Sequence, residues 1–425
     1  MCFYSRLLIL CITTMLFGIK AQAIDKFFMG LGDLPDGEFR SHAHSISADG
    51  SVVVGSSNSK NGPEAFRWTK ANGLEGLGDL SGGKFGSEAF NVSADGSVVV
   101  GYATSTSGIE VFRWTKATGM KGLGVLVHPY YPPMISADGS VVVFTDIISE
   151  STIKAFRWTE ADGLKELGDL FGGEFKTMVF DVSTDGSVVV GYSNSKNGPE
   201  AFRWTIANGI EGLGDLPDGE FHSVATSVSA DGSVVVGSGS SKYGKQAFRW
   251  TKATGLEGLG DLPGGEYESR AYHVSADGSV VSGQSDAKSG SDAFRWTKTG
   301  KMLSLNLNSL NSIYHDVGLF ASRISDDGNV ILVNVLPKIN SPVIWNNKNG
   351  VQVLKNILIN KHAVDMNGWG LENASGISSD GIKIVGYGTN PDGKREAWIV
   401  SLRNEELRPT TPDVPPAPTG PKITY

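Results

Sequence analysis

A repeat of about 46 residues constrains the fold of this chain more than any other feature. Each copy reads GLGDL, then SADGSVVVG, then AFRWT, and a turn aspartate marks the middle of each copy. Successive markers lie 43 to 53 residues apart. They are Asp49, Asp95, Asp138, Asp185, Asp231, Asp277, Asp327 and Asp380. Because repeats of this period bury their apolar faces against neighbouring copies, the sequence predicts a solenoid, an array or a propeller of eight units.

Each copy contains four short apolar segments separated by turn residues, which predict four β-strands. In residues 44–80 these segments are HSIS, SVVVGSS, EAFRWT and LEGLGDL. The first two are joined through Asp49-Gly50, a strong hairpin signal because glycine accepts positive φ. Val52 to Val54 are apolar on both faces, as a strand between neighbouring sheets requires. We therefore predict an all-β fold, an eight-bladed β-propeller of four-stranded antiparallel blades.

The two ends of the repeat array complement each other. Residues 24–34 contain a GLGDL segment with no preceding unit, and residues 376–400 form a last unit with no GLGDL after it. We predict that the N-terminal strand pairs beside residues 397–400 and closes the ring, which hides the sheet edges. An open β-solenoid is the competing architecture, but solenoid repeats of roughly 20–30 residues are shorter than these units.

The AFRWT segment predicts the core between blades. Alternation along a strand places Phe66 and Trp68 on one face, where their rings are expected to cement adjacent blades. Arg67 faces the opposite side and recurs in six copies, and the turn and GLGDL aspartates also recur, so we expect Arg–Asp pairs within or between blades. The S-x-D-G-S turn also resembles small calcium loops, but one carboxylate per turn is too few for calcium and favours a simple hairpin.

The N-terminal segment predicts export. Residues 1–23 carry Arg6, an apolar run and the sequence Ala21-Gln22-Ala23, which together indicate a signal peptide. Both cysteines lie inside it, so the mature chain can form no disulfide. We predict a propeller over residues 24–407, a proline-rich disordered tail over residues 408–425, and a periplasmic, cell-surface or extracellular location.

Charge and composition limit the partners. Without the leader the chain has 35 basic and 45 acidic residues, which argues against nucleic acid as a partner. No later stretch has about 18 consecutive apolar residues, so no transmembrane segment is expected in the mature chain. No cofactor and no metal site are expected, and the sequence does not determine the oligomeric state.

The candidate ligand-binding residues lie where the repeat varies, at the propeller face that surrounds the channel mouth. One group is an aromatic residue five positions after the GLGDL leucine, which could stack on a sugar or plug the seam between adjacent blades. A second group is the irregular segment from Val125 to Pro133, which is either an adhesive patch or a decayed repeat. The candidates are Phe39, Phe85, His128, Tyr130, Tyr131, Phe175, Phe221 and Tyr267.

Signals for catalysis are weak. The histidines show no metalloprotease spacing, and no nucleophile elbow or phosphate-binding glycine loop occurs. A carbohydrate-active hydrolase or lyase remains the alternative, with acids such as Asp146, Glu150 or Asp316 converging at the channel mouth.

The unit resembles the bacterial extracellular repeat family called HAF, whose consensus carries H-A-F-x-W, G-x-L-G-G and D/N-G-x-V-V-G segments. The similarity extends over nearly all of the mature chain, with EAFRWT at residues 64–69 and 200–205 and QAFRWT at residues 246–251. The histidine of the family name is replaced in every copy. The resemblance implies an exported propeller protein without an assigned reaction.

From these observations we predict an exported, non-catalytic module that binds a carbohydrate or protein ligand. A carbohydrate-active enzyme and a structural envelope component are the two alternatives. Exposed aromatic residues in one pocket would favour binding, clustered acids would favour catalysis, and neither would favour a structural role.

Overall fold

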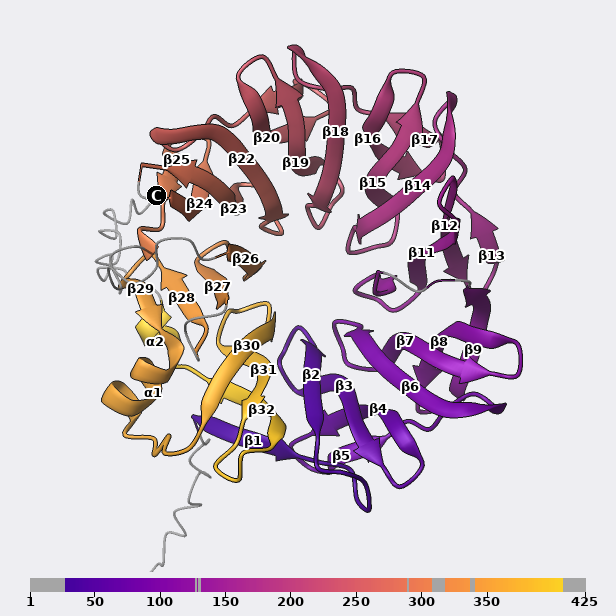
Figure 1. Ribbon diagram of the computed structural model, residues 1–425, viewed down its shortest axis with the longest axis vertical. Helices are drawn as coiled ribbons and strands as arrows, with labels where there is room; N and C mark the ends of the chain where they lie inside the picture. Colours follow the sequence, from indigo (N-terminus) through magenta and orange to yellow (C-terminus); the bar gives the residue numbers. More distant parts are fainter. Residues whose placement is uncertain are drawn as a thin grey trace, which may run out of the picture.

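The computed structural model describes residues 27–126, 128, 131–288, 290–307, 318–336 and 341–407. These residues form short strands grouped in sheets that are arranged radially around a central axis (Figure 1). The all-β class and the four-stranded antiparallel sheets are confirmed, and the arrangement is consistent with a β-propeller. The predicted signal peptide and the predicted tail lie outside the described residues and stay predictions.

Six sheets have four strands each. Three of them come from the first half of the array and its ends. They contain β2 (Ser41–Ile46), β3 (Val52–Ser59), β4 (Gly62–Thr69) and β5 (Gly73–Gly76); β6 (Gly82–Val92), β7 (Val98–Ser105), β8 (Gly108–Thr115) and β9 (Gly119–Leu126); and β1 (Phe28–Gly32) with β30 (Gly370–Ile377), β31 (Lys383–Thr389) and β32 (Arg395–Ser401).

The other three four-stranded sheets follow in the second half of the chain. They contain β18 (Asp218–Val228), β19 (Val234–Ser241), β20 (Gly244–Thr251) and β21 (Gly255–Gly258); β22 (Gly264–Val274), β23 (Val280–Ala287), β24 (Gly290–Thr297) and β25 (Lys301–Ser304); and β26 (Gly318–Ile324), β27 (Val330–Leu336), β28 (Val343–Asn346) and β29 (Gly350–Val353). Two helices occur among the described residues, α1 (Leu354–His362) and α2 (Asn404–Leu407).

A seventh sheet has eight strands and consists of two four-stranded units. One parallel pair, Ile153 with Lys176, joins the units. Pro132 and Pro133 precede the two-residue strand β10, and the missing N–H groups of these prolines explain why it is so short. The strands are β10 (Met134–Ile135), β11 (Val141–Ser149), β12 (Thr152–Thr159), β13 (Gly163–Glu166), β14 (Gly172–Val182), β15 (Val188–Ser195), β16 (Gly198–Thr205) and β17 (Gly209–Gly212).

The hairpin between the first two strands of a unit is fixed by its serine and aspartate. Ser47 Oγ donates to Asp49 Oδ1 at 2.7 Å and accepts the N–H of Val52 at 3.0 Å. Asp49 also accepts the N–H of Ser51 at 2.9 Å, and this bond lowers the pKa of the Asp49 carboxyl. Gly50 has a φ of 67°, which a side chain would strain. The predicted hairpin is confirmed.

A chain of backbone hydrogen bonds connects these turns to one another around the axis. The N–H of Ala48 donates to the carbonyl of Ala94 at 3.0 Å, and the N–H of Ser379 in the last unit donates back to the carbonyl of Ala48 at 3.0 Å. Each turn therefore bonds to the turn of the next unit. The eight donors are Ala48, Ala94, Ala137, Thr184, Ala230, Ala276, Asp326 and Ser379.

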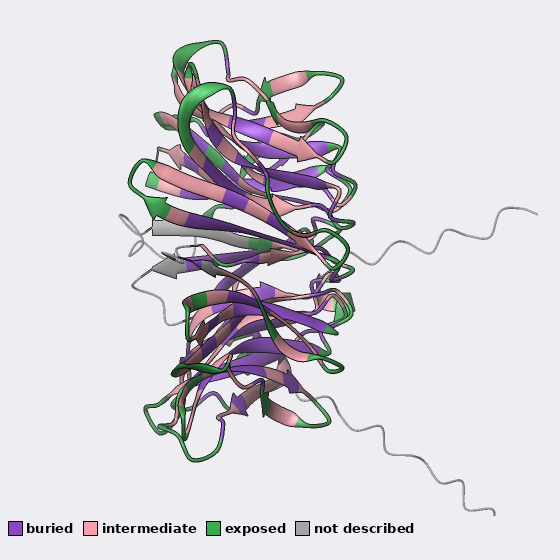
Figure 2. Cartoon of the chain, turned by 90° about the vertical axis from the view of Figure 1, so that its right-hand side faces the viewer, coloured by how far each residue is buried: buried purple, intermediate pink, exposed green. Residues whose placement is uncertain are grey.

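The core lies between sheets rather than within them. Phe66 and Val53 pack in one cluster with Val385 and Ala397 of the last sheet, and all four are fully buried. Equivalent clusters separate the other neighbouring sheets. The side view of Figure 2 shows the buried residues along the strands and the exposed ones mainly in the loops. The prediction that the repeated phenylalanine cements adjacent blades is confirmed.

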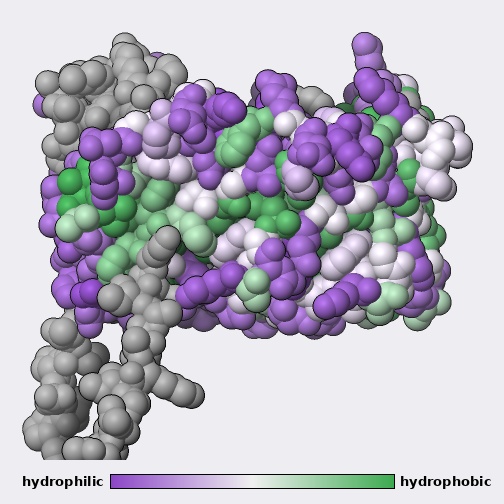
Figure 3. All heavy atoms as spheres, turned by 90° about the horizontal axis from the view of Figure 1, so that it is seen from below, coloured by the Kyte–Doolittle hydropathy of each residue, from purple (hydrophilic) through white to green (hydrophobic). Residues whose placement is uncertain are grey.

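The rim of the molecule is mixed in character. The face shown in Figure 3 carries hydrophobic residues in small groups among hydrophilic ones. Exposed apolar residues among polar ones are common on protein surfaces.

Buried serines add polar links between successive sheets. Ser87 on β6 is 4% exposed; its hydroxyl donates to the carbonyl of Gly78 and accepts the N–H of Ala65 at 3.0 Å. Ser223 makes the same two bonds to Gly214 and Ala201. One hydroxyl thus pairs with a buried N–H of the preceding sheet and with a half-buried carbonyl of the connection that follows that sheet, so the buried N–H is not left unpaired.

The predicted Arg–Asp pairing is met at one repeated arginine, since Arg157 Nη1 lies 3.9 Å from Oδ2 of Asp162, an aspartate outside the two repeated positions. Other repeated arginines have different partners. Arg67 Nε donates instead to the carbonyl of Gly96 in the next turn at 3.2 Å, and Arg203 does the same to Gly232. The guanidinium of Arg203 also lies 6.0 Å from the ring centroid of Trp250 in the next sheet. The arginine therefore links sheets through a carbonyl and an aromatic face, while the turn aspartate is used by its own hairpin.

The two ends of the array pair as predicted. β1 runs antiparallel to β32, with Met29 opposite Ile399 and Gly30 opposite Trp398. Phe27 stacks on His362 of α1 at 3.8 Å, and His362 Nε2 lies 3.0 Å from Glu406 Oε2 of α2. The prediction that the N-terminal strand lies beside residues 397–400 is confirmed.

We predict that Phe202→Ala lowers the free energy of unfolding by about 3–5 kcal/mol, because it removes a fully buried ring between sheets. Phe171→Ala is the matched control, since Phe171 is 93% exposed, and it should change the free energy by no more than about 0.5 kcal/mol. Denaturant unfolding at constant m-value measures both. Equal effects of the two substitutions would contradict the assignment of the core.

Candidate functional site

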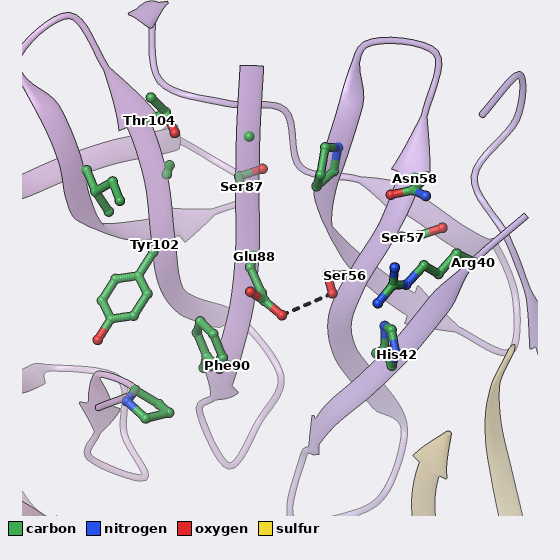
Figure 4. Close-up of a pocket in the computed structure, with 15 residues that line it drawn as sticks. Arg40, His42, Ser56, Ser57, Asn58, Ser87, Glu88, Phe90, Tyr102 and Thr104 are labelled. Atoms are coloured by element: carbon green, nitrogen blue, oxygen red, sulfur yellow. Dashed lines mark hydrogen bonds between the residues drawn. The ribbon is translucent and has the colours of Figure 1, made fainter. Parts of the chain in front are cut away.

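A cleft of about 610 Å³ opens between the β2–β5 sheet and the β6–β9 sheet (Figure 4). Its charged and aromatic wall residues come from the residue just before β2, from the innermost strands β2 and β6, and from β7. They are Arg40, His42, Glu88, Phe90 and Tyr102. Ser56, Ser57, Asn58 and Thr104 contribute polar groups on the side nearer the rim.

Glu88 is held between the two sheets. Its Oε1 atom accepts hydrogen bonds from His44 Nε2 at 2.9 Å and from Ser56 Oγ at 3.2 Å. Burial favours the neutral acid, but these two bonds and the nearby histidines outweigh burial, so the pKa of Glu88 is lower than usual. The cleft therefore presents a fixed carboxylate at neutral pH.

His42 lies beside this carboxylate as a neutral imidazole. Burial, and to a smaller extent the charges of His44, Arg40 and Arg395, lower its pKa to about 4, while Glu88 acts in the opposite direction. The ring of His42 packs edge-on against Tyr387 of the last sheet at 4.7 Å. The imidazole can accept or donate a hydrogen bond to a ligand without adding charge.

Aromatic rings form the other wall of the cleft. Phe90 lies 5.2 Å from the ring of His44 and 5.3 Å from the ring of Tyr102, and all three are half-buried. The hydroxyl of Tyr102 donates to the backbone carbonyl of Tyr131. The rings are thus fixed in place while part of each surface remains accessible.

Strand register explains why these side chains converge. His42 is opposite Ser56 on β3, and Glu88 is opposite Tyr102 on β7, so each pair occupies the same face of its sheet. The glycine before Ser56 allows close approach of β2, because a Cβ at Gly55 would collide with the carbonyl oxygen of His42. Ser56 and Tyr102 each directly follow a VVVG segment, which recurs in several copies.

Sequence reasoning missed this site, although a signal for it exists. The residue after the VVVG segment varies between copies, while the segment stays mostly apolar and ends in glycine except at Phe144 and Val333. That residue is Ser56, Tyr102, Thr145, Tyr192, Ser238, Gln284, Asn334 or Tyr387. Variation at this position could have pointed to the cleft wall, where Ser56 and Tyr102 lie, although Thr145 and Asn334 are buried at the same position.

The aromatic candidates after GLGDL lie elsewhere. Phe85, Phe175, Phe221 and Tyr267 fall in the irregular stretch near the start of β6, β14, β18 and β22. Of this group, Phe175 is 42% exposed and the others, including Phe39, are half-buried.

Three of these aromatic residues contact the preceding sheet. Lys394 lies over the ring of Phe39 at 5.4 Å, Lys154 lies over Phe175 at 5.3 Å, and the hydroxyl of Tyr267 accepts a bond from Gln246 at 2.7 Å. None of the aromatic candidates after GLGDL that the structure describes lines the cleft. The contacts favour the seam-plugging alternative for these three residues.

The irregular third unit separates its candidate residues. Tyr131 lies next to the cleft, where its ring packs edge-on against Phe180 at 5.6 Å. His128 is exposed, and its Nδ1 lies 3.0 Å from the carbonyl of Ile147. Tyr130 lies outside the described residues.

The acids considered for catalysis do not gather in the cleft. Asp146 is 3% exposed on β11 and Glu150 is exposed in the following turn, whereas Asp316 lies outside the described residues. Within the described ranges, no group of three or more His, Cys, Asp or Glu residues is arranged to hold a metal ion. The helices of the described part are too short or too polar to span a membrane.

Comparison with known proteins gives only distant similarity. No protein-family model matches the chain, and no curated protein matches its sequence. TolB from Acinetobacter baumannii is 13% identical with a TM-score of 0.37, and the alignment covers 62% of this chain and 61% of that one. An oligogalacturonate lyase from Vibrio parahaemolyticus is 10% identical with a TM-score of 0.48, and the alignment covers 90% and 98% of the two chains. At these values the similarities carry no argument about function.

We predict that His42 makes the protein less stable as the pH falls from about 6.5 to about 4. The folded state keeps the imidazole neutral while the unfolded chain binds the proton, so the free energy of unfolding decreases in this window. The contribution is on the order of 1 kcal/mol after allowance for solvent screening of a half-buried ring.

Denaturant unfolding at several pH values tests this effect. His42→Gln should flatten the pH dependence, whereas the control His222→Gln on β18 should leave it unchanged. An identical pH slope for His42→Gln and the parent would show that His42 is not held neutral.

Proposed function

We propose that the chain is an exported, non-catalytic binding module that holds a carbohydrate in the cleft between the β2–β5 and β6–β9 sheets. The observation that carries this proposal is the placement of the fixed Glu88 carboxylate opposite Arg40 and beside the accessible rings of Phe90 and Tyr102. Charged and aromatic groups thus face one another across a space of ligand size.

The chemistry of the wall suits a sugar. A sugar ring has apolar C–H faces and hydroxyl edges, and the negative face of an aromatic ring attracts C–H groups. Glu88 and Arg40 can each make charge-assisted hydrogen bonds to hydroxyls. The volume of about 610 Å³ falls within the range of roughly 300–1,000 Å³ that is typical of small-ligand sites.

The same wall supports binding over hydrolysis. Glycosidases commonly use two carboxyl groups, one of which must be protonated to act as an acid. Glu88 is the one carboxylate among the described residues that line the cleft, and its lowered pKa disfavours the protonated form. A hydrolase would need a second acid brought into the cleft, and a structural envelope component would need no such cleft.

We further infer that the repeats form eight blades in a closed ring, in which the eight-stranded sheet contributes two blades. The eight turn-to-turn hydrogen bonds and the pairing of β1 with β32 support this count. Export as a periplasmic, cell-surface or extracellular protein of the HAF type remains part of the proposal and rests on the sequence alone.

We predict that Glu88→Gln weakens glycan binding at least tenfold, because it removes the charge from a hydrogen-bond acceptor in the cleft. The experiment is a glycan-array screen of residues 24–425, followed by calorimetric titration of the glycan with the strongest signal. Glu211→Gln, an exposed carboxylate on β17, is the matched control and should bind like the parent.

Two outcomes would overturn the proposed function. One is the absence of binding to any glycan on the array. The other is binding that Glu88→Gln and Glu211→Gln leave equally unchanged, since the ligand would then lie outside the cleft. Release of a shortened sugar by the parent protein would instead favour the enzyme.

A further inference from the structure

We propose that the cleft is one end of a longer binding track for a linear, neutral oligosaccharide, and this inference rests on the proposed function. The track follows a set of half-buried rings that we call the aromatic arc. The arc consists of His42, Phe90, Tyr102, Tyr131, Phe180 and Tyr192.

The arc continues out of the cleft through ring contacts and one hydrogen bond. Phe90 contacts Tyr102 at 5.3 Å, and the hydroxyl of Tyr102 reaches the backbone carbonyl of Tyr131. The ring of Tyr131 lies 5.6 Å from Phe180, which in turn lies 6.1 Å from Tyr192. The rings therefore extend from β2 through β6 and β7 to β14 and β15, across the first four units of the array.

Packing does not require these aromatic residues. On the next sheet, β18–β21, the positions equivalent to Phe90 and Tyr102 hold Thr226 and Ser238. Thr226 Oγ1 donates to the carbonyl of Ala271 in the following sheet at 2.9 Å, so a small hydroxyl satisfies the same place in the fold. A purely structural role would give similar residues in every copy, because the core of every copy is alike.

The opposite side of the array is more polar at these positions. Tyr272 on β22 is an aromatic exception, but its hydroxyl donates to Gln284 at 3.1 Å. The corresponding residue of the last unit, Ser375, donates its hydroxyl to the carbonyl of Ala43. Tyr387 of the last unit, at the position equivalent to Tyr102, is a second exception, and it adjoins the arc because its ring packs against His42 at 4.7 Å. The rings that contact one another thus gather on one part of the inner wall, as expected for a site that holds a ligand.

The charges beside the arc are balanced, which favours a neutral ligand. Glu88 accepts its bonds from His44 and Ser56 and faces Arg40. At the end near β31, Arg395 pairs with Glu372 at 2.7 Å.

At the far end of the arc, the carboxyl group of Asp181 is likewise held by hydrogen bonds within the protein. Asp181 accepts bonds from the hydroxyl of Ser227 at 2.8 Å and from the N–H of Val228 at 3.0 Å. No described charge along the arc calls for an anionic or cationic partner. A succession of rings with hydroxyl and amide groups between them matches the alternating faces and edges of a chain of neutral sugars.

The test measures how affinity depends on ligand length. Neutral cello-, malto-, xylo- and chito-oligosaccharides of two to six units are titrated calorimetrically into residues 24–425. We expect at least one series in which affinity rises tenfold or more from the disaccharide to the hexasaccharide. Phe180→Ala should abolish this gain and leave the disaccharide affinity unchanged, because Phe180 lies beyond the cleft.

Two further variants show whether a loss of the gain in affinity is specific to the aromatic arc. Tyr243→Ala removes a ring that is 64% exposed outside the arc, and it should preserve the gain with length. Tyr192→Ala repeats the test at the end of the arc and serves in place of Phe180→Ala if that variant does not fold.

Each result has a defined meaning. Disaccharide binding that is sensitive to Glu88→Gln, but with no gain in longer sugars, would overturn the track and keep the proposed function. Binding to none of the four series at any length would overturn both. Tight binding of an unstructured neutral peptide, lost in Phe180→Ala while no sugar binds, would replace the oligosaccharide with an extended peptide.

Discussion

The backbone hydrogen bond from each turn to the next turn is the interaction on which the rest of the structure depends. It fixes the inner ends of the strands around the axis, with the N–H of Ser379 returning to the carbonyl of Ala48. The buried phenylalanines and serines then hold each sheet against its neighbour at a constant spacing. Both kinds of contact recur in several described units, with Phe112, Phe202 and Phe248 between sheets and Ser223 and Ser269 as links, so the residues that make them can vary little.

This constraint leaves few positions free to acquire a function. A side chain on the first strand of a unit that points away from the core can change without disturbing the packing between sheets. The same holds for the residue opposite it on the second strand, directly after the VVVG segment. His42 with Ser56 and Glu88 with Tyr102 occupy such positions. The cleft therefore arises from variation on a rigid scaffold, and its groups are held by hydrogen bonds to the same scaffold.

The repeat made most of the fold predictable, since the hairpin signal at Asp49-Gly50 and the split unit at the chain ends both depend on local residues. Arg–Asp pairs were expected throughout the array, but Arg67 and Arg203 donate to backbone carbonyls of the next turn, because periodicity alone does not distinguish a carboxylate acceptor from a carbonyl acceptor. The site was missed for a related reason. His44 and Glu88 are 44 residues apart, and their contact depends on register and on the spacing between sheets.

The structure of the protein crystallised with a neutral hexasaccharide tests the central claim most directly. The account predicts sugar rings against Phe90 and Tyr102, a hydroxyl within hydrogen-bond distance of Glu88, and further sugars toward Phe180. Sugar bound on the outer rim, or a cleft that stays empty while the protein binds the sugar in solution, would contradict it.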